Sequence, residues 1–168
     1  MVNLIVASTT QGVIGVGDKL PWRYSEDLRW FKKQTMGGVL IVGRKTYEGL
    51  PSLPGREVIV VSRNHEYDAP ILTFSVKGAL EAAYNLFPDR SVWIAGGGQV
   101  YASALSMGIV DRIVYTEVPD LIPPGQAVVF WPLEVLGQDF QLQSSEVSTQ
   151  NPSIKYQIWC RKASDAQR

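Results

Sequence analysis

Five short runs of branched, apolar residues constrain the fold of this chain more than any other feature. They are VNLIVA at 2–7, VLIV at 39–42, EVIVVS at 57–62, SVWIA at 91–95 and DRIVYTEV at 111–118. Each run is four to eight residues long, and several are apolar throughout, which is typical of strands buried on both faces of a largely parallel sheet. The runs therefore predict an α/β protein in which helices connect the strands.

Helix signals lie between these runs. A helix is expected over 26–36, where Ser25 can act as the N-cap. A second is expected over 76–87 with Ser75 as its N-cap, and a third from about 99 to 107. Each of these segments follows one apolar run and precedes another, as crossover helices of a parallel sheet do.

The last third of the chain has a different pattern. FQLQSSEV at 140–147 and SIKYQIWCR at 153–161 alternate apolar and polar residues, as half-exposed antiparallel strands do. We therefore expect a single domain over 1–162 with an antiparallel edge, followed by a polar tail over 163–168.

Composition excludes several classes of protein. The 168 residues fit one domain, and 16 Lys and Arg balance 16 Asp and Glu, which argues against a general nucleic-acid binder. No run of about 18 apolar residues predicts a membrane span, and the N-terminus does not resemble a signal peptide. Cys160 and His65 are the only residues of their types, so we expect neither an internal disulfide nor a metal site, and a cytoplasmic protein.

The segment from Gly38 to Thr46 has the outline of a phosphate-binding loop. It has one residue too many, Arg44, between its second glycine and Lys45, and a Val-Leu-Ile-Val run between the glycines favours an extended chain over a turn. What remains is a strand that ends at Gly43 and a helix start with two cations and a hydroxyl, which suits an anion. A solvated helix start with chance charges is equally compatible with this segment alone.

A second glycine motif follows the run at 91–95. Three glycines at 96–98 precede a helix, so the backbone can turn freely and a ligand can approach the main chain closely. The helix end offers N–H donors to a pyrophosphate. Because Tyr101 stands where the dinucleotide fingerprint requires its third glycine, this is a different motif. Its alternative interpretation is a tight strand-to-helix turn.

Asp27 is the acid that the sequence singles out. It lies one helical turn from Phe31 on an otherwise apolar face, which would meet Leu4 and Val6 if the helix packs on the sheet. A carboxylate on such a face must be paired or have a raised pKa. The alternative is a carboxylate that only favours the helix dipole, which is the role we expect for Glu26.

A long glycine-rich loop at 12–22 precedes this helix. It contains Gly12, Gly15 and Gly17 as possible hinges and ends in Leu20-Pro21-Trp22. Loops that combine hinge glycines with large apolar residues often act as lids over a site.

The combination of these segments resembles the dihydrofolate reductase family over roughly residues 1–160. The matching positions, in the expected order and spacing, are Ala7, Ile14-Gly15, Leu20-Pro21-Trp22, Asp27 to Lys32, Gly43 to Thr46, Leu53 to Arg56, Ser62-Arg63, Gly96 to Tyr101, and Tyr115-Thr116. The resemblance implies an eight-stranded, mostly parallel sheet flanked by four helices. It also implies NADPH-dependent reduction of 7,8-dihydrofolate to tetrahydrofolate for one-carbon metabolism, binding of antifolate inhibitors, and a monomer.

The resemblance also implies roles on the substrate side. Asp27 would accept hydrogen bonds from the 2-amino group and N3 of the pterin, with the Thr116 hydroxyl supporting it. A water near Leu20 and Trp22 would protonate N5, and Arg56 would clamp the glutamate α-carboxylate. The remaining substrate contacts would come from Val6, Ala7, Leu28, Phe31, Leu50 and Leu53.

On the cofactor side, the resemblance implies that Ala7 and Ile14 present main-chain groups to the nicotinamide carboxamide. The adenosine 2′-phosphate would lie among Arg44, Lys45, Thr46, Ser62 and Arg63. The pyrophosphate would lie against Gly97, Gly98, Gln99 and Val100. Gly15, Leu20, Gly43, Gly96 and Tyr101 complete the expected cofactor site, with a cis peptide bond between Gly96 and Gly97.

The chain departs from the family pattern at two places. The first is mild: Leu20 stands where many bacterial members have Met. The second is a longer segment. Members usually have Gly-Asp-Thr before a late aromatic-proline pair, whereas residues 124–132 here read PGQAVVFWP. The aspartate that clasps the loop at 12–22 in some members is therefore missing, and their loop cycle cannot be transferred.

Two other functions remain as alternatives at this stage. The pyrimidine reductase of riboflavin synthesis is a related NADPH enzyme, but it would not need Asp27 together with Arg56. The other alternative is a non-catalytic nucleotide-binding or structural protein derived from a reductase. Loss of Asp27, Trp22 or the triple glycine would have indicated it, and all of them are present.

Overall fold

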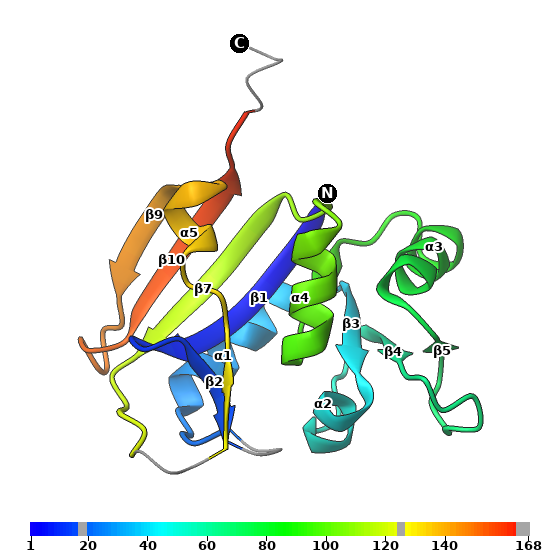
Figure 1. Cartoon of the computed structure of the whole chain (residues 1–168), viewed down its shortest axis with the longest axis horizontal. Helices are drawn as coiled ribbons and strands as arrows, with labels where there is room; N and C mark the ends of the chain where they lie inside the picture. Colours follow the sequence, from blue (N-terminus) through cyan, green and yellow to red (C-terminus); the bar gives the residue numbers. More distant parts are fainter. Residues whose placement is uncertain (17–19, 124–126, 164–168) are drawn as a thin grey trace.

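The computed structural model describes residues 1–16, 20–123 and 127–163, whose helices and strands have an α/β arrangement (Figure 1). The strands are β1 (Val2–Thr9), β2 (Val13–Val16), β3 (Val39–Gly43), β4 (Glu57–Val61), β5 (Leu72–Thr73), β6 (Val92–Ile94), β7 (Arg112–Val118), β8 (Val128–Phe130), β9 (Phe140–Val147) and β10 (Lys155–Arg161). The helices are α1 (Ser25–Thr35), α2 (Arg44–Gly49), α3 (Val76–Leu86), α4 (Gly98–Ser106) and α5 (Val135–Gln138).

Eight strands form the main sheet in the order β5-β4-β3-β6-β1-β7-β10-β9. The pairs from β5 to β7 are parallel, whereas β10 runs antiparallel to both β7 and β9. The five apolar runs, together with β5, thus form the parallel part of the sheet, and the alternating segments form its antiparallel edge. This confirms the mostly parallel eight-stranded fold expected from the sequence.

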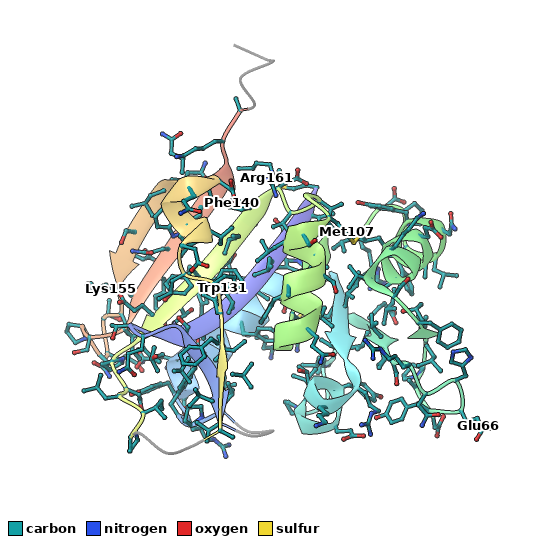
Figure 2. The ribbon with its side chains drawn as sticks, in the orientation of Figure 1. Glu66, Met107, Trp131, Phe140, Lys155 and Arg161 are labelled. Carbon is teal, nitrogen blue, oxygen red and sulfur yellow. The ribbon has the colours of Figure 1, made fainter. Side chains whose placement is uncertain are left out.

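Helices cover both faces of the sheet (Figure 1). One apolar cluster joins α3 and α4 to Leu4 and Val6 of β1, and Trp131 and Phe140 lie over the same face (Figure 2). A second cluster joins aromatic residues of α1 and α2 to Ile5 on the opposite face. Because neighbouring residues of a strand point to opposite faces, β1 contributes to both clusters.

The helix boundaries largely follow the sequence signals. Ser75 does cap α3, since the Gly78 N–H donates to its hydroxyl at 2.9 Å. Ser25, however, is not the N-cap of α1: it is the first helical residue, and Tyr24 precedes it with extended backbone. The Tyr24 carbonyl accepts the Leu28 N–H at 3.1 Å, so the helix begins one residue earlier than expected. Among the described residues there is also a short kinked segment, α5, beyond the four helices expected, and Leu136 and Gly137 within it have non-helical backbone angles.

Three short strands were not expected from the sequence. Two of them, β2 and β8, pair with each other in a separate two-stranded sheet, so residues 13–16 of the glycine-rich loop are a strand. The third is the two-residue β5 at the sheet edge. The rest of that loop at 17–19, the 124–126 part of the departing segment and the tail at 164–168 lie outside the described residues.

No helix in the described part of the chain is both long and apolar enough to cross a membrane.

Candidate active site

The predicted site residues gather at one edge of the sheet. The neighbouring strands β3, β6, β1 and β7 are all parallel, so their carboxyl ends lie at the same edge. In open α/β sheets ligands bind in the crevice outside these ends. Asp27 is supplied by the connection after β2, Thr116 by the end of β7, and the two glycine motifs by the ends of β3 and β6.

Asp27 is held close to Thr116. Burial raises the pKa of the Asp27 carboxyl to about 6, and the charge of Glu26 adds to this rise. The Thr116 hydroxyl, which donates a hydrogen bond to the carboxylate, lowers the pKa and so limits the shift. The expectation of a raised pKa is confirmed, and the pairing with Thr116 is the one implied by the resemblance.

The apolar face of α1 packs on the sheet, but through a different residue of β1 than expected. Trp30 and Phe31 lie in the cluster of Ile5, whereas Leu4 and Val6 belong to the cluster on the opposite face. The expectation that this face meets Leu4 and Val6 was therefore wrong. Ile5, which the sequence reasoning missed, is the residue of β1 whose side chain faces α1.

Two further hydrogen bonds fix the first turn of α1. The Tyr24 hydroxyl donates to Asp120 Oδ1 at 2.5 Å, and Asp120 follows the end of β7. The Ser148 hydroxyl donates to Glu26, so Glu26 does more than favour the helix dipole. Neither pair was predicted, because no sequence pattern connects residues so far apart in the chain.

The predicted substrate wall is assembled from α1 and the segment before β4. Phe31, Leu50 and Leu53 pack against the cluster of Ile5, while Leu28 on α1 is 49% exposed. An apolar wall with one open side suits the rings of a bound organic ligand.

Arg56 lies beside this wall. Its Nη1 donates to Thr35 Oγ1 at 3.3 Å, and its Nε donates to the Pro54 carbonyl at 3.4 Å. Burial lowers the pKa of the guanidinium below its usual value, but the group remains a cation at any working pH. The side chain is thus oriented by two weak hydrogen bonds and keeps donors for an anionic ligand.

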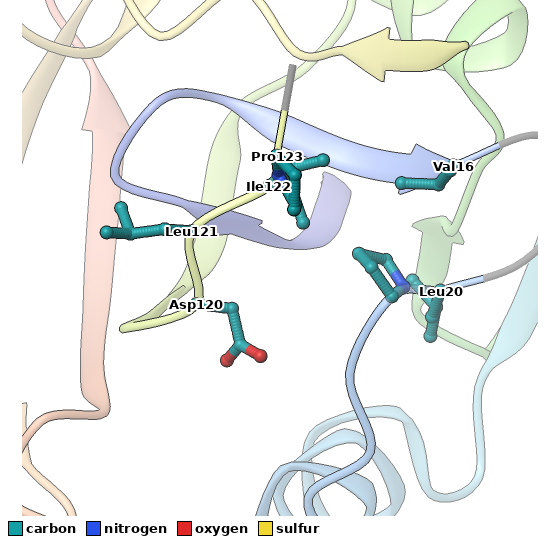
Figure 3. Close-up of a pocket in the computed structure, with 7 residues that line it drawn as sticks. Val16, Leu20, Asp120, Leu121, Ile122 and Pro123 are labelled. Atoms are coloured by element: carbon teal, nitrogen blue, oxygen red, sulfur yellow. The ribbon is translucent and has the colours of Figure 1, made fainter. Parts of the chain in front are cut away.

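Trp22 and Leu20 have contrasting environments. Trp22 is buried, and its indole N–H has no hydrogen-bond partner among the described residues. Such a donor usually binds water or ligand. Leu20 is 59% exposed and lines a cavity of about 390 Å³ between residues 20–21 and 120–123 (Figure 3). Of the expected site residues, this cavity touches only Leu20.

The two glycine motifs, which are 50 residues apart in the sequence, meet at the ends of β3 and β6. The Gly43 N–H donates to the Gly96 carbonyl at 2.8 Å. A Cβ atom on Gly97 would lie 3.1 Å from Thr46 Oγ1, so only glycine leaves this approach open. The peptide bond between Gly96 and Gly97 is cis, as the resemblance implies.

Cationic side chains surround the start of α2. Arg44 is exposed, 3.5 Å from Glu48 and above the Tyr67 ring at 5.8 Å from its centroid. Lys45 and Arg63 are also exposed. The Ser62 hydroxyl is buried and accepts the Asn64 N–H at 3.1 Å, so it helps to shape the turn that carries Arg63.

Tyr101 connects the glycine turn to the substrate side. Its buried hydroxyl donates to the Ile5 carbonyl at 2.7 Å. A Cβ atom on Gly96 would lie 3.2 Å from the hydroxyl oxygen of Tyr101. Ile14 and Val129 flank the turn from the other side, since a Cβ atom on Gly98 would lie 2.9 Å from Val129 Cγ1 and 3.9 Å from Ile14 Cδ1. The glycine turn is therefore enclosed by side chains from β2, β8 and α4.

These residues fit a phosphorylated dinucleotide. The backbone turn at 96–98 is made of glycines, where an added Cβ atom would occupy the space that a ligand needs. Cationic side chains lie beside this turn, at the start of α2. Within the described ranges, no three His, Cys, Asp or Glu side chains gather as a metal site would need.

A parallel sheet that brings a partly buried acid beside such a cradle has the architecture of a nicotinamide-dependent oxidoreductase. The family model for dihydrofolate reductase matches residues 1–163. Dihydrofolate reductase of Mycobacterium tuberculosis strain H37Rv is 36% identical over 163 residues, which cover 95% of this chain and 96% of the relative. That of Mycobacterium leprae is 38% identical over 74% of this chain and 81% of the relative. That of Neisseria meningitidis strain Z2491 is 40% identical over 75% and 76%.

The chain belongs to the dihydrofolate reductase family. As a member of this family it is an NADPH-dependent oxidoreductase that reduces 7,8-dihydrofolate to tetrahydrofolate, a reaction of one-carbon metabolism. The resemblance stated from the sequence is thereby confirmed.

Proposed function

We propose that Asp27 is the catalytic carboxylate of this reduction, which orients the pterin ring and polarises it towards protonation at N5. The observation that carries the proposal is the place of this partly buried carboxyl, on α1 beside Thr116 at the carboxyl edge of the sheet, where burial raises its pKa to about 6. At neutral pH this group is mostly ionised, so it can accept hydrogen bonds from the 2-amino group and N3 of the pterin. Its negative charge then favours protonation of the ring at N5.

The proton for N5 would come from a water held near Leu20 and Trp22. Asp27 approaches the pterin from the side of the 2-amino group, so it does not reach N5 directly. Trp22 supports this proposal, because its buried indole N–H has no partner among the described residues and can donate to that water.

The rest of the substrate would lie along the apolar wall. Phe31, Leu50 and Leu53 would contact the pterin and aminobenzoyl rings, with Leu28 at the open side. Ile5 replaces Val6 as the proposed side-chain contact from β1, because Ile5 packs on the face that α1 covers. Arg56 would bind the glutamate α-carboxylate, a contact that its planar guanidinium makes with two parallel hydrogen bonds.

The cofactor side follows from the same geometry. Bound NADPH supplies the hydride that is transferred to C6 of the pterin. Ala7 and Ile14 would orient the nicotinamide carboxamide through the main chain. The glycine turn at 96–98 and the start of α4 would hold the pyrophosphate. Arg44, Lys45, Thr46, Ser62 and Arg63 would bind the 2′-phosphate.

We also propose that the protein is a cytoplasmic monomer that binds antifolate inhibitors at the pterin site. Light scattering after size exclusion tests the monomer, and competition of an antifolate with dihydrofolate tests the shared site.

A spectrophotometric assay of NADPH oxidation tests the proposed function. We expect activity with dihydrofolate that depends on Asp27. Activity with the pyrimidine substrate of riboflavin synthesis, and none with dihydrofolate, would instead support the related pyrimidine reductase. Nucleotide binding without turnover of either substrate would support a non-catalytic protein.

A further inference from the structure

The first turn of α1 is bound to two distant parts of the chain by three side-chain hydrogen bonds. Tyr24 donates to Asp120, Ser148 donates to Glu26, and Thr116 donates to Asp27. Two of these bonds, Tyr24–Asp120 and Thr116–Asp27, connect α1 to β7 and the residues that follow it. Asp27 is the proposed catalytic residue, and Tyr24 and Asp120 have no role in the function proposed above.

The Tyr24–Asp120 bond lies where it can control the direction of α1. The Tyr24 carbonyl accepts the Leu28 N–H at 3.1 Å, the first hydrogen bond of the helix, while its hydroxyl reaches Asp120 Oδ1 at 2.5 Å. The backbone of Tyr24 thus belongs to the helix start, and its side chain is fixed to the segment after β7. The Thr116–Asp27 hydrogen bond joins the same two segments of the chain.

A hollow lies beside this connection. The cavity of about 390 Å³ separates Leu20 and Pro21 from residues 121–123, and Asp120 borders it (Figure 3). Leu121 is 72% exposed. The Tyr24–Asp120 hydrogen bond therefore joins the two segments beside this hollow, and an acceptor with full charge makes such a bond short and strong.

We infer that Tyr24 and Asp120 are a positioning pair for the Asp27 carboxylate, joined by the hydroxyl-to-carboxylate hydrogen bond that fixes the first turn of α1 to the segment after β7. The pair touches no reacting atom. It holds the helix start so that Asp27 keeps the orientation in which it meets both Thr116 and the pterin. This inference rests on the proposed role of Asp27.

Tyr24→Phe is the matching test, because it removes the hydroxyl and keeps the ring. We expect single-turnover hydride transfer at saturating NADPH and dihydrofolate to be about tenfold slower. The KM for NADPH should stay within about twofold, since the cofactor residues are untouched. Urea unfolding would establish that the variant is fully folded under the assay conditions. Tyr84→Phe removes an exposed hydroxyl from α3, and we expect it to leave the rate unchanged.

Variants of the acceptor make the test specific. Asp120→Ala should slow hydride transfer as much as Tyr24→Phe, and the double variant should be no slower than either single variant. Asp120→Asn should recover most of the rate, because its amide oxygen still accepts from Tyr24.

Three results would overturn the inference: a native rate in Tyr24→Phe, losses that multiply in the double variant, or an Asn variant as slow as the Ala variant. A native rate in Tyr24→Phe would leave the role of Asp27 intact. Absence of dihydrofolate turnover by the unaltered enzyme would remove both proposals.

Discussion

The Thr116 hydroxyl on β7 donates a hydrogen bond to the carboxylate of Asp27 on α1, and this bond opposes the effect of burial on the same group. Burial and the neighbouring charge of Glu26 raise the pKa of Asp27, and the hydrogen bond lowers it, with about 6 as the result. A carboxyl near this value changes its protonation within the range in which an enzyme works. Each of these influences on the pKa of Asp27 can be tested by a substitution.

Replacing Asp27 by Asn should slow hydride transfer by about 10²-fold or more at neutral pH, within the usual range for acid-base assistance. The amide keeps the shape of the side chain but lacks the charge that favours protonation of N5. We expect the rate of the unaltered enzyme to fall as pH rises, and the variant to recover partly in acid, where solvent protonates N5 unaided. Stopped-flow single turnovers measure the rate, and normal NADPH binding is the control. A near-native neutral rate would assign Asp27 to the helix dipole alone.

The same substitution should stabilise the protein at neutral pH. The folded-state pKa of about 6 lies above the ordinary aspartate value of 3.8, so the folded protein retains this proton more readily than the unfolded chain. The contribution of this carboxyl to the free energy of unfolding is therefore fully present below about pH 4 and is lost as pH rises through about 6. Asp27→Asn avoids the loss, which is about 2 to 3 kcal/mol at most. Urea unfolding at several pH values measures it, and a gap between the proteins that widens in acid would contradict the assignment.

Substitutions of the two neighbours should shift the pKa of Asp27 in opposite directions. Thr116→Val removes the hydrogen bond that stabilises the ionised form, so the pKa should rise. Glu26→Gln removes a nearby negative charge, so the pKa should fall, and each shift should be roughly half a unit to one unit. A ¹³C titration of the Asp27 carboxyl measures both. Shifts of the same sign would show that altered solvent access, and not the named interactions, controls this carboxyl.

Arg56→Lys should weaken binding of dihydrofolate but hardly affect a pterin without the glutamate tail. Lysine retains the charge but cannot make two parallel hydrogen bonds to a carboxylate. We expect a loss of about tenfold in affinity for the full substrate, measured by fluorescence titration with both ligands. Arg90→Lys, on an arginine near Glu57, is the matched control. Equal losses for both ligands would mean that Arg56 acts through its bonds to Thr35 and Pro54.

The cations at the start of α2 should determine the choice of cofactor. NADH lacks the 2′-phosphate, and each charge-assisted bond to that group contributes about 1.5 to 3 kcal/mol before screening. We expect a preference for NADPH of at least about 10²-fold in kcat/KM. Arg44→Ala should raise the KM for NADPH far more than that for NADH. Arg44 is exposed and its ion pair with Glu48 is long, so its guanidinium can bind the 2′-phosphate that NADH lacks. Similar efficiency with both cofactors at moderate salt would contradict this pocket.

The sequence predicted the central strands because a strand buried on both faces must be apolar at every position. The strand β1 shows what sequence-based prediction could not provide. A fully apolar run does not indicate which residues face α1, so the choice of Leu4 and Val6 over Ile5 was wrong. The strands β2, β5 and β8 are only two to four residues long, and runs of this length carry no clear period.

Site residues that belong to short sequence motifs were predictable. Contacts between residues far apart in the chain were not. The triple glycine and the acid in α1 stand out locally, since each breaks the pattern around it. The bonds from Tyr24 to Asp120 and from Ser148 to Glu26 join residues 96 and 122 positions apart. Such pairs depend on how the antiparallel edge and the residues after β7 lie over α1, which no local spacing encodes.

The central position of β1 has a consequence for synthesis of the chain. Its Val2 N–H donates to Asp111 at 2.7 Å across 109 residues, and the Asn3 side chain donates to the Val92 carbonyl across 89 residues. During synthesis, at about 5 to 20 residues per second, β1 therefore waits for β6 at residues 92–94 to pair with one of its edges and for β7 at residues 112–118 to pair with the other. Until then VNLIVA is an apolar segment of high β-propensity, open to pairing with other nascent chains. Truncation before β6 should yield aggregates that chaperones retain, whereas loss of the residues beyond β10 should not.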